Sequence, residues 1–89
     1  MDDQERFSRL MAYAHAFANG KYTLYDKEGK RTEAVYYTDY ESDNGLAKDE
    51  EGYEEYSCIA FKRISDGTLL EINYHRIPAK VVCDREVIY

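Results

Sequence analysis

The first apolar pattern in the chain has the spacing of a helix. Between residues 3 and 19 the apolar side chains recur every three or four positions and form one stripe: Phe7, Leu10, Met11, Ala14, Phe17 and Ala18. Asp2 precedes this stretch and Glu5 follows three residues later, which is typical of a capping box. Gly20 favours a stop in the left-handed conformation. The pattern predicts an N-terminal helix over residues 3–19, whose stripe needs a sheet to cover it.

A second pattern, over residues 56–77, predicts a β-hairpin. Two runs rich in β-branched and aromatic residues flank Asp66-Gly67, which is a strong hairpin signal. A two-residue loop would set these pairs opposite each other: Ser65 and Thr68, Lys62 and Glu71, Phe61 and Ile72, Ile59 and Tyr74, Cys58 and His75. Apolar side chains then match on one face and opposite charges on the other, so a slip of one residue would break both.

The remaining segments predict further strands. Residues 21–26 and 31–40 form strands on either side of a Gly29 bulge turn, and residues 80–83 form a last strand after Pro78. Residues 41–52 lack the alternation of a strand and read as an acidic loop with a short helical turn at 46–51. We therefore expect a single α+β domain over residues 1–89, with one N-terminal helix packed on a single antiparallel sheet of about five strands.

Composition supports a globular chain with no membrane segment. Hydrophobic residues make up 44% of the 89 residues, and no apolar run approaches the roughly 20 residues that span a bilayer. The acidic start of the chain lacks the basic and apolar parts of a signal peptide. We expect a cytoplasmic protein in which Cys58 and Cys83 are reduced thiols.

Charge is distributed very unevenly along the chain. The net charge is −6, yet residues 36–56 hold eight acidic residues against Lys48 alone, so that stretch carries −7 and the rest of the chain +1. A nucleic-acid backbone would be repelled by such a segment, whereas a basic protein surface would be attracted. The pattern favours a protein partner with a basic surface and argues against direct nucleic-acid binding.

Tyrosines are interleaved with these acids. Tyrosine is common in strands for packing reasons alone. It also brings a large contact area at low entropic cost and is enriched in interfaces. We therefore expect partner binding through the acids and tyrosines of this stretch: Tyr36, Tyr40, Glu41, Asp43, Asp49, Glu50, Glu51, Tyr53, Glu54, Glu55 and Tyr56.

Three patterns could carry chemistry, and each has a plainer explanation. Cys58 facing His75 could be an activated thiol, but no orienting third group or oxyanion loop is evident. The histidines and cysteines lack the spacing of a zinc site. Asp39, Glu41, Asp43 and Glu50 resemble a calcium loop whose glycine is one position late, which leaves a solvated acidic loop as the default. No phosphate-binding or hydrolase motif occurs. We expect no catalytic residue, metal or cofactor.

These observations favour a non-enzymatic binding module that acts as an inhibitor. In size, acidity and compactness the chain resembles small phage or mobile-element proteins that mimic nucleic acid, such as anti-CRISPR inhibitors of guide-RNA nucleases. The resemblance is one of type, and no residue is carried over from it. The alternative is a structural or assembly module that pairs through a sheet edge, as a homodimer or accessory subunit. That alternative is indicated by the two-sided aromatic strand at 31–40 and by the apolar tail Val87-Ile88-Tyr89.

Overall fold

The computed structural model describes residues 1–89 and begins with helix α1, Asp3–Ala16. The predicted capping box is confirmed: the Glu5 N–H donates to the Asp2 carboxylate at 2.8 Å, and the Asp2 N–H donates back to the Glu5 carboxylate at 3.4 Å. The helix ends earlier than predicted, with Phe17 as its C-cap residue. No helix in the structure has both the length and the apolar character needed to cross a bilayer.

Gly20 has a different role from the one predicted. Its φ is not positive, so it does not form a left-handed helix stop. A Cβ atom at this position would instead lie 2.7 Å from the Cys83 Sγ and 3.3 Å from the Phe17 carbonyl oxygen. Glycine is required because the chain leaving α1 passes directly against the last strands of the sheet.

The sheet has six strands, all paired antiparallel, in the order β4-β3-β2-β1-β5-β6. This confirms the α+β prediction and adds one short strand, because the chain end folds back on β5. The strands are β1 (Lys21–Tyr25), β2 (Arg31–Asp43), β3 (Glu55–Arg63), β4 (Leu69–Ile72), β5 (Lys80–Cys83) and β6 (Glu86–Val87).

The core lies between α1 and one face of the sheet. Twelve buried residues form it, and α1 contributes Phe7, Leu10 and Ala14. Tyr22 and Phe61 meet edge to face at 5.1 Å, the geometry that aromatic pairs favour. The predicted helix stripe and the strand faces therefore pack as expected.

The hairpin between β3 and β4 forms with a longer loop than predicted. Phe61 lies opposite Leu70, and Ile59 lies opposite Ile72, so the register is shifted by two residues. A two-residue type I′ turn needs positive φ at both central residues, yet only Gly67 has it, at 73°. The Asp66 carboxylate instead accepts the Thr68 N–H at 3.0 Å. A shift of two keeps each side chain on its expected face but removes the predicted Lys62–Glu71 and Cys58–His75 pairs.

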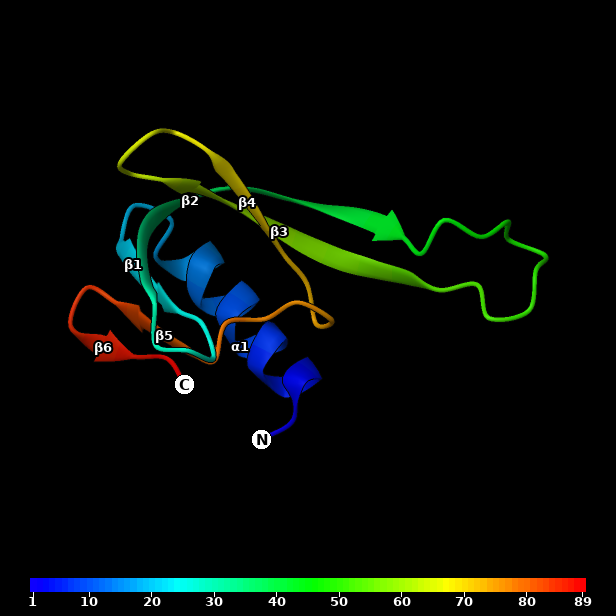
Figure 1. Ribbon diagram of the computed structural model, residues 1–89, viewed down its shortest axis with the longest axis horizontal. Helices are drawn as coiled ribbons and strands as arrows, with labels where there is room; N and C mark the ends of the chain where they lie inside the picture. The colour runs from blue at the N-terminus through cyan, green and yellow to red at the C-terminus, as the bar shows by residue number, and fades with distance from the viewer.

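A two-stranded arm projects from this body. Pairing with β1 ends at Val35, and pairing with β4 ends at Ile59. The arm, defined here as residues 36–57, contains the free parts of β2 and β3 and their connecting loop (Figure 1). It extends along the longest dimension of the molecule, 44 Å, and none of its residues is buried. Strand β2 runs to Asp43, beyond the predicted end at residue 40, and residues 46–51 form turns rather than a helical turn.

Candidate functional site

A β-bulge at Tyr37 decides which side chains the arm presents on each face. Tyr36 pairs with Phe61 and Thr38 pairs with Ala60, so Tyr37 has no partner in β3. One extra residue reverses the alternation of side chains along β2. Before the bulge the even-numbered side chains face α1, and beyond it the odd-numbered ones do.

The first carboxylate on the helix side belongs to Asp39, at the root of the arm. Its Oδ2 lies 2.6 Å from His15 Nε2 on α1, and it also accepts the hydroxyl of Tyr36. These two contacts, with Tyr36 the stronger, hold the pKa of Asp39 below its ordinary value. Tyr36 is half-buried and packs edge-on against Phe61 at 6.4 Å, so it positions Asp39 instead of offering free contact area.

Three further carboxylates follow Asp39 on the same face. Glu41 lies opposite Ser57, whose hydroxyl donates to it at 2.7 Å. Asp43 lies directly opposite Glu55, a cross-strand pair of like charges that destabilises the arm. We call Asp39, Glu41, Asp43 and Glu55 the carboxylate face. Sequence alone placed acids in this stretch but did not align them.

The phenol rings of Tyr40 and Tyr56 come from the alternate positions and lie on the other face. The Tyr40 hydroxyl donates to Glu71 at 2.5 Å, which raises the pKa of Tyr40 to about 12. The Tyr56 hydroxyl donates to the Asp43 carbonyl at 3.0 Å, and its ring meets His75 edge-on at 5.4 Å. The arm therefore carries both predicted residue types, but it separates charge and rings onto two faces.

The loop at the tip holds the other predicted residues. The Tyr53 hydroxyl donates to Glu55 at 2.6 Å, and the Glu50 carboxylate accepts the Ala47 N–H at 3.2 Å. Glu54 lies 3.2 Å from the Nε2 of His75 and is half-buried. Asp49 and Glu51 are exposed. All eleven predicted binding residues thus belong to one arm.

The predicted thiol–imidazole pair does not form. Cys58 is fully buried and lies opposite Tyr40, and burial raises the pKa of its thiol. His75 lies beyond the end of β4 and contacts Glu54. A buried thiol of raised pKa is a poor nucleophile, so the structure offers no activated cysteine.

The calcium-loop hypothesis is not supported by the geometry either. Asp39, Glu41 and Asp43 lie in an extended strand and span about 14 Å, so all three carboxylates cannot reach one ion. No group of three histidine, cysteine, aspartate or glutamate side chains is arranged to hold a metal ion.

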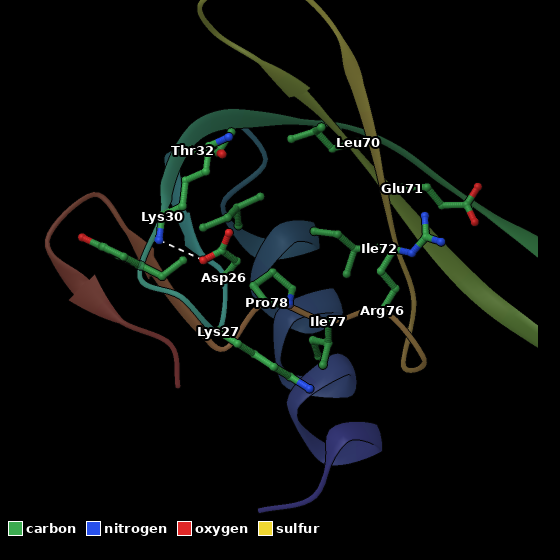
Figure 2. Close-up of a pocket in the computed structure, with 12 residues that line it drawn as sticks. Asp26, Lys27, Lys30, Thr32, Leu70, Glu71, Ile72, Arg76, Ile77 and Pro78 are labelled. Atoms are coloured by element: carbon green, nitrogen blue, oxygen red, sulfur yellow. Dashed lines mark hydrogen bonds between the residues drawn. The ribbon is translucent and has the colours of Figure 1, made fainter.

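A hollow at the opposite end of the molecule lies between the β1–β2 turn and β4. It has a volume of about 260 Å³ and lies over Leu24, Ile72 and Pro78 (Figure 2). Its carboxylates are already engaged: Asp26 accepts the Lys30 N–H at 2.8 Å, and Glu71 accepts the Tyr40 hydroxyl. Charges of both signs line the hollow without converging, so the arm remains the better candidate.

Sequence reasoning missed the residues that organise the carboxylate face. The bulge at Tyr37 and the contact from His15 depend on how α1 crosses the sheet, and no local pattern signals either one. Ser57 was overlooked because a serine in a strand is unremarkable. Comparisons of the chain with models of protein families, with characterised proteins and with solved structures gave no match.

Proposed function

We propose that the protein is a small non-enzymatic binding module whose arm docks on a basic surface of another protein. The observation that carries this proposal is the concentration of charge: residues 36–57 hold eight acids and one lysine, a net −7, on an arm without a buried residue. A projecting acidic hairpin can enter a groove that a compact body cannot. We further propose that the partner is a nucleic-acid-binding protein, such as a guide-RNA nuclease, and that the protein inhibits it.

A row of carboxylates supports mimicry of nucleic acid. Alternate residues of a strand are about 7 Å apart, so Asp39, Glu41 and Asp43 supply one charge per about 7 Å along one face. Glu55 on the other strand doubles the charge at Asp43. This row has about half the axial charge density of a single nucleic-acid strand, which carries one charge per about 3.4 Å. A cationic groove built for phosphates would therefore meet a sparser row of charges of the same sign.

The like-charge pair in the arm favours a bound state. Asp43 opposite Glu55 costs the isolated protein about 0.2–1 kcal/mol. A cation from the partner placed between them would remove that cost. Such complementarity also speeds encounter and selects against acidic partners. The rings of Tyr40 and Tyr56 would add contact area on the other face.

Two observations weigh against the homodimer alternative. Two of the three residues in the apolar tail that suggested it are used internally: Ile88 is buried, and the Tyr89 hydroxyl donates to the Pro78 carbonyl at 3.0 Å, whereas Val87 is exposed. Two copies pairing through their arms would bring like charges together. We therefore favour a basic partner over a second copy.

The test uses an immobilised guide-RNA nuclease free of RNA, and polyarginine as a second basic probe. We expect the protein to bind, the affinity to fall steeply with salt, and guide RNA to compete for the nuclease. The double reversal Glu41→Lys, Glu55→Lys should weaken binding by about tenfold or more, equal to about 1.4 kcal/mol. Affinities are measured by biolayer interferometry.

The matched control reverses two exposed acids on the body, Glu28→Lys and Glu86→Lys. Both doubles change the net charge equally. Each also removes a tyrosine hydroxyl bond, from Tyr53 to Glu55 in the arm and from Tyr13 to Glu86 on the body, so the main difference is the position of the charge. Equal effects of the two doubles would contradict docking through the arm. Binding that is indifferent to salt, or absent from both probes at low salt, would contradict the proposal as a whole.

A further inference from the structure

The outer edge of β2 is open along the arm. Strand β1 pairs with β2 only as far as Val35. From residue 36 to 43, β2 pairs with β3 on one side and has no strand on the other, outer side. At the tip, the Asn44 N–H donates to the Glu54 carbonyl at 3.2 Å. In an antiparallel ladder the bonded residues alternate. Thr38, Tyr40 and Ser42 therefore bond to β3, whereas Asp39, Glu41 and Asp43 direct their backbone groups away from it.

Most of these outward groups have no partner. The Asp43 carbonyl accepts the Tyr56 hydroxyl at 3.0 Å, and the Asp39 carbonyl receives a long contact of 3.4 Å from the Thr38 hydroxyl. The N–H groups of Asp39, Glu41 and Asp43 and the carbonyl of Glu41 are left for an incoming strand. An exposed row of such groups is a template for pairing with another chain.

The outward-facing residues are also the acidic ones. Each of Asp39, Glu41 and Asp43 offers a backbone group at the edge and a carboxylate on the face toward α1. We infer that this edge accepts an extended segment of the partner, with lysine or arginine at alternate positions, as an added antiparallel strand. Backbone bonds would supply affinity, and cross-strand pairs of opposite charge would fix the register. The inference rests on the proposed function and specifies its binding mode.

The other occupants fit this edge less well. A second copy would set its own Asp39, Glu41 and Asp43 against these, a repulsion that suits an edge kept free of self-pairing. The outer edge of β3 is a poorer site, because the segment after β4 lies beside it: the Tyr56 ring meets both Tyr74 and His75 edge-on.

The test uses a short peptide, Lys-Val-Lys-Thr-Lys-Val-Lys, and the same peptide N-methylated at every lysine. Methylation keeps the charge but removes the donors that would face β2. We expect NMR amide exchange to show fast exchange at Glu41 and Asp43 in the free protein and slow exchange at Tyr40 and Ser42. The unmodified peptide should slow exchange at Glu41 and Asp43. Methylation should weaken binding several-fold, because it removes the bond to the Glu41 carbonyl and sets N-methyl groups against the edge of β2.

A matched pair of variants tests the edge from the protein side. Glu41→Gln removes the carboxylate, whereas Glu41→Pro also removes the outward N–H and leaves the bonds to β3. The proline variant should bind the peptide several-fold more weakly than the glutamine variant, which corresponds to one net hydrogen bond.

Four results would overturn the inference. The first is equal binding of both peptides, which places a partner on the carboxylate face without strand pairing and leaves the proposed function standing. The second is equal binding by Glu41→Gln and Glu41→Pro. The third is protection of the same amides by raised protein concentration alone, which assigns the edge to a dimer. The fourth is the absence of peptide binding at low salt.

Discussion

The body of this molecule (residues 1–35 and 58–89) and its arm are stabilised in different ways. All 15 buried residues lie in the body, which has a net charge of +1, and none lies in the arm, which carries −7. The body is held by a core between α1 and the sheet, whereas the arm is held by one ladder of backbone bonds and by contacts of its tyrosines. A bare two-stranded hairpin is marginal in water. The difference teaches that the sequence of the arm is not explained by folding, which is why function is sought there.

The largest expected difference in the free energy of unfolding comes from removing one aromatic ring from each region. Phe61→Ala empties a fully buried site against Tyr22 and Tyr36 and should lower the free energy of unfolding by about 3–5 kcal/mol. Tyr53→Ala at the tip of the arm should cost less than about 1 kcal/mol, because it buries little. Urea denaturation measures both. Similar losses would show that the arm shares in the core.

A smaller test turns the like-charge pair of the arm into an opposite pair. Glu55→Lys, made in a Tyr53→Phe background to remove the Tyr53 hydroxyl bond, should stabilise the arm by about 0.5 kcal/mol through Asp43. Amide exchange should slow at Tyr40 and Ser42, which bond to β3, and not in β1 or β5. The same change should weaken binding to a basic partner.

The control for this test is Glu28→Lys in the same background, which reverses an exposed charge on the body. It should alter neither arm exchange nor binding. An arm that exchanges faster after Glu55→Lys would contradict the view that the paired acids oppose folding.

The smallest expected effect depends on pH at the root of the arm. The pKa of Asp39 lies below its ordinary 3.8, chiefly because Tyr36 donates to the carboxylate. A lowered pKa adds stability above pH 3.8 and loses it as the pH falls through the folded value. The Asp39→Asn variant should therefore lose less stability than the native protein in this acid range, by about 0.3 kcal/mol because the carboxylate is partly exposed. Parallel acid-induced shifts of the two melting temperatures would rule this out.

Much of the fold could be predicted from local chemistry. The capping box of Asp2 and Glu5 and the strand at residues 80–83 depend on neighbouring residues only, and both are confirmed. The β3–β4 register failed because Asp66-Gly67 suits two turns, and the Asp66 side chain selects the longer one by accepting the Thr68 N–H. Each side chain of the hairpin still lies on its predicted face, because the register differs by two residues.

The candidate site was predicted in position but not in arrangement. The number of acids located residues 36–56, and alternation along β2 sets Glu41 and Asp43 on one face. The bulge at Tyr37 decides that this face is the one toward α1. Val35, Tyr36 and Tyr37 are all good strand formers, so nothing local marks an extra residue. The bulge lies between Tyr36, which packs against Phe61, and Asp39, which contacts His15 on α1.

The bulge also lets the arm absorb the loss of one residue. Deleting Tyr37 would remove the bulge, set Thr38 directly after Tyr36, and leave Asp39 and the acids beyond it on the face toward α1. Pairing Tyr37 with β3 would instead turn the outer strand over, so that Tyr40 faced α1. Contacts from His15 to Tyr40 in place of Asp39, observed by NMR, would reveal such an inverted arm. The charged interface is thus preserved through a one-residue deletion that would invert a strictly alternating strand.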